Sequence, residues 1–506
     1  MTACTLLVAL CLGGQTDAPI VLDAKRQLFL DDHLIDSAEN VVRQVHTVEK
    51  QPGNPVLRAT EPWEKEVAIL YGSVLREPDK YRAWYYTAGN VGYAESDDGI
   101  AWTKPRLGIV EVDGQDTNLV IRRGAEEGGA GAIPYFYEVF GVHRDDRDPD
   151  PSRRYKMGFL SLDRNYSGPN EDPFHRGQRR GLGVAASPDG IHWKLLDNWA
   201  TEAICDGGSH WTFDPARGKY LLYGRTKHVD PKVIEAWGDN DWVGRYYWGR
   251  AVARAESDDF IHWDITEPAK APMVMTADTQ DPPGTEIYSM HVFPYESVYL
   301  GLVQVFHNQA DTCHLDIQLA VSHDSVHFTR VGDRRAFIPV GPVGSWDRFN
   351  TSLANNRPIA VDDTLRFYYG GRTSRHSPYN GPDKGQPGGA IGFGSIPRDR
   401  FVSMSASFDG GRIVTKPLKL QGQSLHLNAK SDFGRILVEV LDADGTTIAR
   451  SEPIGEDGLD VPVRWQEGSL KDLQSPVVLR ITLQNALLFA LWCSRGWSCF
   501  DQSGTR

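Results

Sequence analysis

Apolar and polar positions alternate in short segments along most of the chain, with turn-forming residues between the segments. Successive residues of a strand face opposite sides of a sheet, so this period of two predicts half-buried β-strands. The first clear group comprises residues 67–75, 81–87, 91–94 and a strand at Trp102. Helical periodicity is nearly absent throughout. The pattern predicts an all-β protein built from antiparallel groups of four strands.

One turn motif recurs along the chain, and each copy marks one group of strands. A serine stands six positions before an aromatic residue, an aspartate follows the serine by two, and Ile or Val precedes the ring by two. The copies begin at Ser96, Ser187, Ser257 and Ser322. Asp and Ser side chains bond their own backbone and Gly tolerates positive φ, so the motif predicts a tight turn. A turn repeated at intervals of roughly 65 to 90 residues is typical of the blades of a β-propeller.

A fifth group without the turn covers residues 350–401, which gives a five-bladed β-propeller over residues 19–402. The spare strand at residues 28–30 is expected to complete the last blade and close the ring, because closure removes exposed strand edges. From residue 403 the alternating segments are shorter and predict a C-terminal β-sandwich over residues 403–490. Residues 491–506 form an atypical tail in which Cys493 and Cys499 are close enough for a small disulfide loop.

Composition narrows the class of protein. The chain has 506 residues with 40% hydrophobic content and 14 Trp, enough for a large core. The net charge of -13 argues against a nucleic-acid binder, which normally carries a basic face, and fits a neutral ligand better than a polyanion. No His/Cys cluster has the spacing of a zinc site, so we expect no metal and no cofactor.

The first 18 residues are interpreted as a signal peptide. A short apolar run around residues 6–12 precedes small and polar residues, with cleavage expected near Ala18, although a basic start is absent. No other segment is long and apolar enough to span a bilayer. We therefore expect an extracytoplasmic protein, either periplasmic or secreted.

Candidate chemistry gathers where the first strand of each blade begins, because these strands surround the propeller axis. The polar residues at these points, together with those that end the N-terminal strand, are Asp31, Asp32, Glu66, Glu138, Asp206, Glu286, Arg348 and Asn350. Paired carboxylates are what glycoside hydrolysis requires, and crowded carboxylates raise one another's pKa.

Roles follow from this convergence. Glu286 is the expected acid, Asp206 or Glu138 would orient it or tune its pKa, and Asp32 or Asp31 would be the nucleophile or base. Glu66, Asn350, His210 and His291 are candidates for substrate binding, and Arg348 could clamp a substrate carboxylate or pair with Asp347. The alternative for each acid is a solvated turn residue, and for each histidine a structural role in the interior.

Several motifs carry a resemblance to a known family. They are Gln-Leu-Phe-Leu-Asp-Asp-His-Leu-Ile at 27–35, the Ser-x-Asp-Gly-Ile-His-Trp turns, Thr-Lys-Pro-Leu at 415–418, Leu-x-Leu-Asn at 425–428, Val-Glu-Val-Leu-Asp-Ala-Asp-Gly at 438–445 and Val-Arg-Trp at 463–465. With these the chain resembles the five-bladed propeller superfamily of glycoside hydrolase families 32, 43 and 68. It is most similar to exported planctomycete-type relatives of the family 32 N-terminal domain.

The resemblance implies a propeller that acts on carbohydrate, but the three catalytic motifs of family 32 are not intact. Arg-Asp-Pro at 147–149 spells one of them within a turn. We therefore expect an exported glycoside hydrolase that cleaves a plant or algal polysaccharide fragment. The alternatives are a non-catalytic carbohydrate-binding propeller and a glycoside phosphorylase with Arg348 at the phosphate.

Overall fold

The computed structural model describes residues 18–124, 129–168, 177–265, 267–310, 312–378, 388–471, 473 and 476–494. The chain forms two compact units. The central unit is Arg43–Ser403, and the terminal unit combines Met1–Val42 with Met404–Arg506. Within the described residues, no helix has the length and apolar character needed to cross a membrane.

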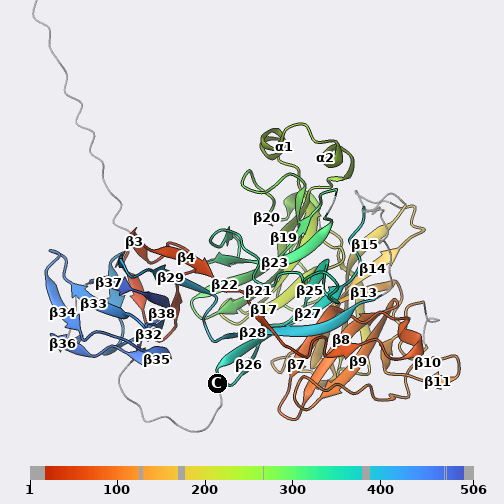
Figure 1. Cartoon of the computed structure of the whole chain (residues 1–506). Helices are drawn as coiled ribbons and strands as arrows, with labels where there is room; N and C mark the ends of the chain where they lie inside the picture. Colours follow the sequence, from red (N-terminus) through yellow and green to blue (C-terminus); the bar gives the residue numbers. More distant parts are fainter. Residues whose placement is uncertain are drawn as a thin grey trace, which may run out of the picture. The chain divides into compact units, whose positions relative to one another are not determined.

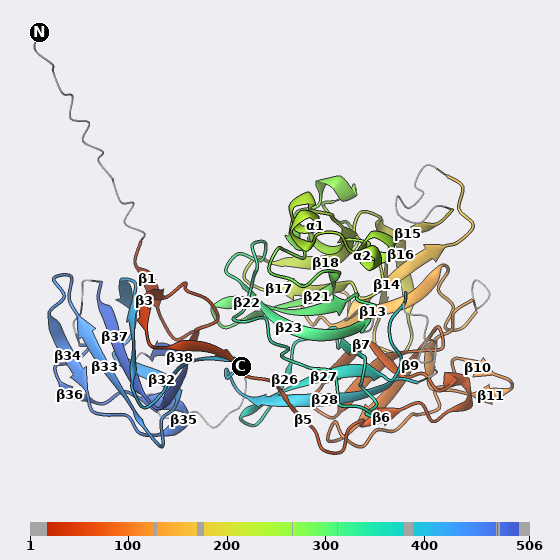
Figure 2. The same ribbon diagram turned by 45° about the horizontal axis from the view of Figure 1, so that its top comes forward.

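The central unit begins with three four-stranded antiparallel sheets (Figure 2). The first contains β7 (Ile69–Arg76), β8 (Tyr81–Thr87), β9 (Asn90–Ser96) and β12 (Leu119–Ile121). The second contains β13 (Phe136–Arg144), β14 (Tyr155–Asp163), β15 (Arg179–Ser187) and β16 (Lys194–Thr201). The third contains β17 (His210–Asp214), β18 (Lys219–Lys227), β19 (Arg250–Ser257) and β20 (Met273–Met275). A separate hairpin joins β10 (Glu111–Val112) to β11 (Gln115–Asp116).

Two further groups of strands share one ten-stranded sheet. The first group contains β21 (Thr285–Tyr295), β22 (Val298–His307), β23 (His314–Ser322) and β24 (Thr329–Arg330). The second contains β25 (Asn350–Leu353), β26 (Ile359–Val361), β27 (Thr364–Arg372) and β28 (Ala390–Pro397). Leu315 on β23 and Asn350 on β25 form the parallel pair that joins them.

The strands that complete the last group differ from the expectation. β5 (Glu49–Lys50) and β6 (Leu57–Arg58) pair with β28, so the chain closes the group with a segment from the start of the central unit. The expected strand at residues 28–30 does not do this. β2 (Gln27–Leu28) pairs with β38 (Ala486–Ser494) in the terminal unit, because its apolar side chains are buried there.

The four Ser-x-Asp segments form the predicted tight turn, with the same hydrogen bonds in each copy. In the second copy the Gly190 amide donates to Ser187 Oγ at 2.9 Å, and the amides of Ile191 and His192 both donate to Asp189 Oδ1 at 2.9 Å. The residue after the aspartate has a positive φ in every copy, 82° at Gly190 and 70° at Phe260. The strand expected at Trp102 is only an isolated bridge between Glu95 and Thr103, and β12 supplies the fourth strand instead.

Apolar cores lie between consecutive sheets of the central unit. Trp84 of the first sheet shares a core with Phe159 of the second, and Leu160 of the second shares one with Trp211 of the third. Tyr85 of the first sheet packs in a common core with Tyr368 on β27. The sheets therefore pack face to face in chain order, and the last group packs on the first. Their first strands are neighbours: β7 contacts β13 and β25, and β17 contacts β13 and β21.

Two short helices interrupt the strand pattern between β18 and β19 (Figure 1). They are α1 (Pro231–Trp237) and α2 (Asp241–Tyr246). Asp230 caps α1 by accepting from the Lys232 amide at 2.9 Å, and Asn240 caps α2 by accepting from the amides of Trp242 and Val243 at 3.0 Å. Side-chain caps compensate for the orphan amides at a helix start. Single 3-10 turns occur at Pro62–Glu64, Pro151–Arg153 and Pro268–Lys270.

The terminal unit has two main sheets that share one core. One contains β2, β29 (Val402–Ala406), β32 (Ser424–Lys430), β35 (Asp457–Pro462) and β38. The other contains β3 (Ile35–Glu39), β30 (Gly411–Thr415), β33 (Arg435–Leu441), β34 (Thr447–Ser451), β36 (Trp465–Glu467) and β37 (Val478–Gln484). β1 (Ile20–Leu22) pairs with β31 (Leu418–Leu420), and the chain passes into the central unit within β4 (Val42–Val45).

The boundary expected at residue 490 falls inside β38, which pairs with β32 through Ser494. The tail expected from residue 491 therefore begins as part of a sheet. Cys499, and with it the suggested disulfide to Cys493, lies outside the described residues, as does nearly all of the expected signal peptide.

Candidate active site

Three of the first strands are irregular near the end at which they begin. The pairing of β7 with β8 shifts between Ile69 and Gly72, so that Tyr71 lies in the irregular stretch. The pairing of β13 with β14 shifts just before Glu138, and that of β21 with β22 shifts at Tyr288. An extra residue in one strand redirects side chains, and such bulges are common next to active sites.

The side chains at these irregular points form one electrostatic group together with Asp206 and Arg225. We call this group the Glu138 cluster: Tyr71, Glu138, Asp206, Arg225 and Tyr288. Burial and the neighbouring Tyr288 and Glu138 raise the pKa of Tyr71 well above its ordinary value. Arg225 lies over the Tyr288 ring, with its guanidinium carbon 4.2 Å from the ring centroid. The cluster joins β7, β13, β18, β21 and the loop before β17.

Glu138 has a carboxylate oxygen that accepts no hydrogen bond within the described part of the chain. It retains part of its accessible surface, yet its Oε1 is buried and has no hydrogen-bond partner among the described residues. Burial, and next to it the charge of Asp206, raise the pKa of Glu138 to about 7, while Arg225, Arg372 and Arg180 act in the opposite direction. A group with this pKa holds a proton that it can give up near neutral pH.

Gly207 explains how the backbone comes this close to Glu138. A Cβ placed on Gly207 would lie 2.5 Å from Glu138 Oε1. A side chain at residue 207 would displace the Glu138 carboxylate, so glycine at this position lets Glu138 keep its place. Asp206, the residue before it, accepts from the Gly207 amide at 2.8 Å.

Asp206 is the ion-paired member of the cluster. Arg180 Nη1 donates to its Oδ1 at 2.8 Å, and Arg225 Nε lies 3.7 Å from its Oδ2. Arg225 is almost fully buried, and a buried guanidinium needs a counter-charge. These two arginines therefore form ion pairs with Asp206 beside Glu138.

Glu286, the expected acid, is fully buried and fully engaged. Its Oε1 accepts from Arg250 Nη1 and from Asn308 Nδ2, both at 2.8 Å. Its Oε2 accepts from the backbone amides of Arg250 at 3.0 Å and Trp248 at 3.3 Å. With four donors on two oxygens, this carboxylate anchors the segment after α2 and has no side open to a substrate oxygen.

Two residues beyond the expected acids and histidines lie close to Tyr288 and Glu286. His376 Nε2 lies 3.1 Å from the Tyr288 hydroxyl, and burial, with Arg250 next, lowers the pKa of His376 to about 3, so its ring is neutral at neutral pH. Trp248 has 48% of its surface exposed, while its amide is bonded to Glu286. Neither residue lies in the repeated motif, so only the fold brings them to Glu138 and Glu286.

The other expected acids lie elsewhere. Glu66 is exposed in a turn with a φ of 62°. The buried acid of that segment is Glu64, whose Oε2 accepts from Lys104 Nζ at 2.6 Å. Asp31 and Asp32 follow β2 and belong to the terminal unit, so the structure does not group them with the Glu138 cluster.

The two candidate histidines are inside the protein. His210 and His291 are buried and stack with ring centroids 4.8 Å apart. His210 Nε2 lies 2.7 Å from the Val292 carbonyl and His291 Nδ1 3.2 Å from that of Ala354. Burial lowers the pKa of His291 to about 4 and that of His210 well below its ordinary value. These contacts are those of neutral packing residues.

The remaining two candidates begin β25. Asn350 is buried, and Arg348 Nη1 donates to the Gly341 carbonyl at 3.3 Å. Asp347 does not pair with Arg348 but with Lys50, at 2.6 Å. The structure thus brings Glu138 and Asp206 together, whereas Glu286, His210, His291 and Arg348 bond to other partners.

A cavity of about 770 Å³ opens at the other ends of the first strands. It is lined by residues after the middle of β7, β13 and β17, such as Arg76, Arg144 and Phe213. Several of its charged groups are paired: Arg144 Nε lies 2.9 Å from Asp146 and Arg147 Nε 2.7 Å from Asp145. Because Glu138 stands at the start of β13, this cavity is separate from the Glu138 cluster.

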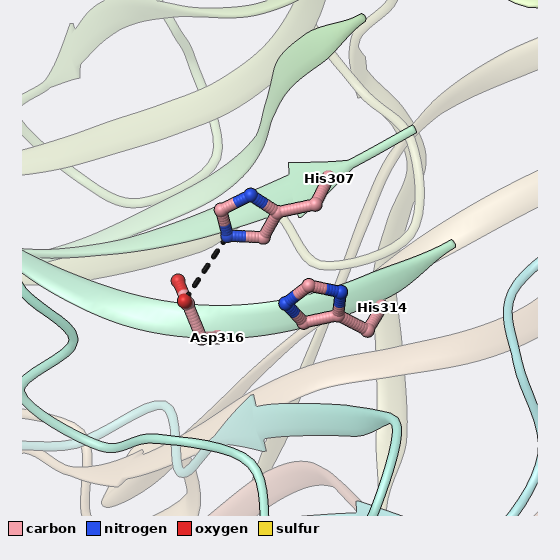
Figure 3. A group of neighbouring side chains, drawn as sticks. All are labelled: His307, His314 and Asp316. Carbon is pink, nitrogen blue, oxygen red and sulfur yellow. Dashed lines mark hydrogen bonds and ion pairs between the residues drawn. The ribbon is translucent and has the colours of Figure 1, made fainter. Parts of the chain in front are cut away.

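One further group could hold a metal. His307, His314 and Asp316 each offer a ligand atom, and these atoms lie within 4.8 Å of one another (Figure 3). No metal was expected because no His/Cys cluster along the chain has the spacing of a zinc site. These three residues come together only because β22 and β23 are paired.

Comparisons with known proteins give solved structures only. No family model and no curated protein matches the chain. A structure described as a glycoside hydrolase is 16% identical, with 69% of this chain and 92% of that chain covered and a TM-score of 0.43. A second structure is 13% identical, with 70% of this chain and 95% of that chain covered and a TM-score of 0.44. Its description states that the GH130 family of mannoside phosphorylases contains glycoside hydrolases that target β-1,2-mannosidic linkages in Candida mannan.

A family 43 arabinoxylan arabinofuranohydrolase from Bacillus subtilis is 11% identical, with 89% and 99% covered and a TM-score of 0.40. At TM-scores below 0.5, these likenesses establish neither the family nor the activity of this chain.

Proposed function

We propose that the central unit is a five-bladed β-propeller and that the Glu138 cluster is the active site of a glycoside hydrolase. The observation that carries the proposal is the state of Glu138: a carboxyl with a pKa of about 7 and a buried oxygen that has no hydrogen-bond partner among the described residues, beside the ion-paired Asp206. Two carboxylates in opposite protonation states are the requirement of glycoside hydrolysis.

In this proposal Glu138 is the acid. Its proton passes to the oxygen of the departing sugar as the glycosidic bond breaks. A water molecule then forms the new bond to the anomeric carbon and returns a proton to the Glu138 carboxylate. Asp206 supplies the second carboxylate, and its charge supports the positive character that develops on the sugar ring. Arg180 and Arg225 pair with Asp206, and the hydroxyls of Tyr71 and Tyr288 would bind sugar hydroxyl groups.

A second candidate function is phosphorolysis, and one observation favours it. Three guanidinium groups, those of Arg225, Arg372 and Arg180, act on Glu138. With Glu138 protonated and Asp206 charged, the group carries excess positive charge, which suits an anion such as phosphate. These arginines, rather than Arg348, would then hold the phosphate that attacks the sugar. A carbohydrate-binding protein without catalysis remains the third reading.

The test is product release from a panel of neutral and acidic glycans, with and without inorganic phosphate. A hydrolase releases reducing sugar in both conditions, whereas a phosphorylase releases sugar phosphate only when phosphate is present. Glu138→Gln should abolish either product, and Glu66→Gln is the matched control because Glu66 is exposed. Binding of a glycan without any product, in wild-type protein, would exclude both enzymes and leave the binding function.

We further propose that the terminal unit is a β-sandwich and that residues 1–18 direct export. The shared core of the two sheets supports the sandwich. Sequencing the N-terminus of protein recovered outside the cytoplasm tests export: a start near Ala18 or Pro19 supports it, and an intact Met1 contradicts it.

A further inference from the structure

His307, His314 and Asp316 lie on one face of the hairpin formed by β22 and β23. His307 and His314 are directly opposite each other in the register, and Asp316 follows two residues later on the same face of β23. The two imidazole rings are stacked, with centroids 4.3 Å apart and planes inclined by 10°. Figure 3 shows His307 turned toward Asp316, with 3.0 Å between His307 Nε2 and Asp316 Oδ2.

This set of atoms matches the ligands of a transition metal. Zinc is bound by imidazole nitrogen at roughly 2.0–2.1 Å and by carboxylate oxygen at about 2.0–2.2 Å, so two ligands of one tetrahedral ion lie roughly 3.4 Å apart. The ligand atoms here lie within 4.8 Å of one another, so binding an ion requires them to move closer by roughly 1.4 Å at most (4.8 − 3.4). Two imidazoles favour Zn²⁺ over Mg²⁺ or Ca²⁺, which prefer oxygen.

The surroundings of the group also suit an ion. The three side chains are partly buried, so an ion there would be shielded yet reachable from solvent. Gln318 Nε2 lies 3.4 Å from Asp316 Oδ1, which leaves Oδ2 directed at the histidines. Second contacts of this kind orient a ligating carboxylate.

We propose that His307, His314 and Asp316 bind one divalent transition-metal ion, with Zn²⁺ the best fit, and that the fourth position is open to water. The proposal is independent of the proposed catalytic function.

An ion bound by His307, His314 and Asp316 would stabilise the turn between β22 and β23. His307 and His314 bracket the turn between β22 and β23, and this turn holds parts of the candidate active site. Asn308 donates to Glu286 Oε1 at 2.8 Å, and the Cys313 carbonyl accepts from the His376 amide at 2.9 Å. An ion that ties the two ends of the turn together would stabilise the Glu286 anchor and the His376–Tyr288 contact.

The test is titration of the tag-free full chain with ZnCl₂ after dialysis against a chelator, followed by calorimetry and thermal unfolding. We expect one Zn²⁺ per chain and a higher Tm with zinc than without it. His314→Ala should weaken binding by roughly tenfold or more, since even the loss of an outer contact costs about that much. Titration with Co²⁺ adds a readout, because visible absorption reports nitrogen and oxygen ligation directly.

The matched control is His426→Ala. His426 also pairs with a carboxylate, 2.6 Å from Asp460, but it belongs to the terminal unit and the metal-ligand group does not include it. Unchanged binding in His426→Ala and weakened binding in His314→Ala support the site. Equal affinities in wild type and His314→Ala, or no binding by the wild type, overturn it. If His314→Ala does not fold, Asp316→Asn keeps the shape of the side chain and must weaken binding in its place.

Discussion

Glu138 and Glu286 stand at the starts of β13 and β21, the first strands of two different sheets. In both places the strand pairing is irregular within two residues of the glutamate. Yet Glu286 accepts four hydrogen bonds from Arg250, Asn308 and the Trp248 amide, whereas Glu138 has a buried oxygen without a donor among the described residues. Corresponding places in the repeat therefore hold carboxylates in opposite situations.

The difference shows that the donors around a carboxylate decide its role. An anion surrounded by an arginine and three N–H donors is stabilised in its charged form and holds the chain in place. A carboxyl with few donors and a negative neighbour is stabilised in its protonated form and can transfer that proton. Replacing the carboxyl group by an amide at each place should therefore give different losses.

The largest expected effect is on catalysis by Glu138→Gln. The amide has the size of the carboxyl but cannot transfer a proton, so kcat/KM should fall by about 10²–10⁴-fold. The free energy of unfolding at neutral pH should not decrease. Steady-state kinetics on the substrate found in the glycan panel, with circular dichroism as the check on folding, measures this. An activity within a few fold of wild type would mean that Glu138 is not the acid.

Glu286→Gln should give the opposite result, a loss of stability. The change leaves the nearly buried Arg250 guanidinium without its counter-charge, which costs about 3–5 kcal/mol when one partner of a buried pair is removed. Urea unfolding of this variant beside Glu138→Gln tests the contrast directly. If both variants unfold at the wild-type midpoint, the anchoring role of Glu286 is refuted.

The third effect is the contribution of Glu138 to the pH dependence of the unfolding free energy. Its pKa in the folded protein is about 7, above the ordinary value of 4.5, so the folded state binds the proton more tightly than the unfolded state. Stability from this group is therefore complete below pH 4.5 and is lost as the pH rises to about 7. The loss is on the order of 3 kcal/mol, from about 1.36 kcal/mol for each pH unit.

Measuring the unfolding free energy of wild type and Glu138→Gln across this range isolates the effect, because all other groups cancel in the difference. The wild type should lose stability relative to the variant between pH 4.5 and 7. A difference that stays constant over the range would contradict the raised pKa.

The repeated turn shows what could be predicted from sequence. A Ser-x-Asp segment makes its hydrogen bonds within a few residues, so its structure follows from local chemistry, and all four turns form as predicted. The strand at residues 28–30 shows the limit. Its alternation predicts a strand but not its partner, and β2 pairs with β38, more than four hundred and fifty residues away.

The candidate site divides in the same way. Glu138 and Asp206 were found because acids at strand starts are visible in the sequence. The preference for Glu286 as the acid could not be checked there, because its donors Arg250 and Asn308 come from β19 and from the turn after β22. Arg225 and His376 escaped notice because nothing in their local sequence marks them.

The smallest expected effect concerns Trp248, whose backbone amide and side chain have different roles. Trp248 gives its backbone amide to Glu286 and leaves 48% of its surface exposed. Trp248→Ala keeps the amide and removes only the contacts of the half-exposed ring with Lys227 and Arg250, so the unfolding free energy should fall by no more than about 1 kcal/mol. If the ring stacks on a sugar, KM should rise by roughly tenfold, equivalent to about 1.4 kcal/mol, with kcat nearly unchanged, because the contact is equal in ground and transition states. A larger fall in stability without a change in KM would instead place the indole, and not only the amide, in the Glu286 anchor.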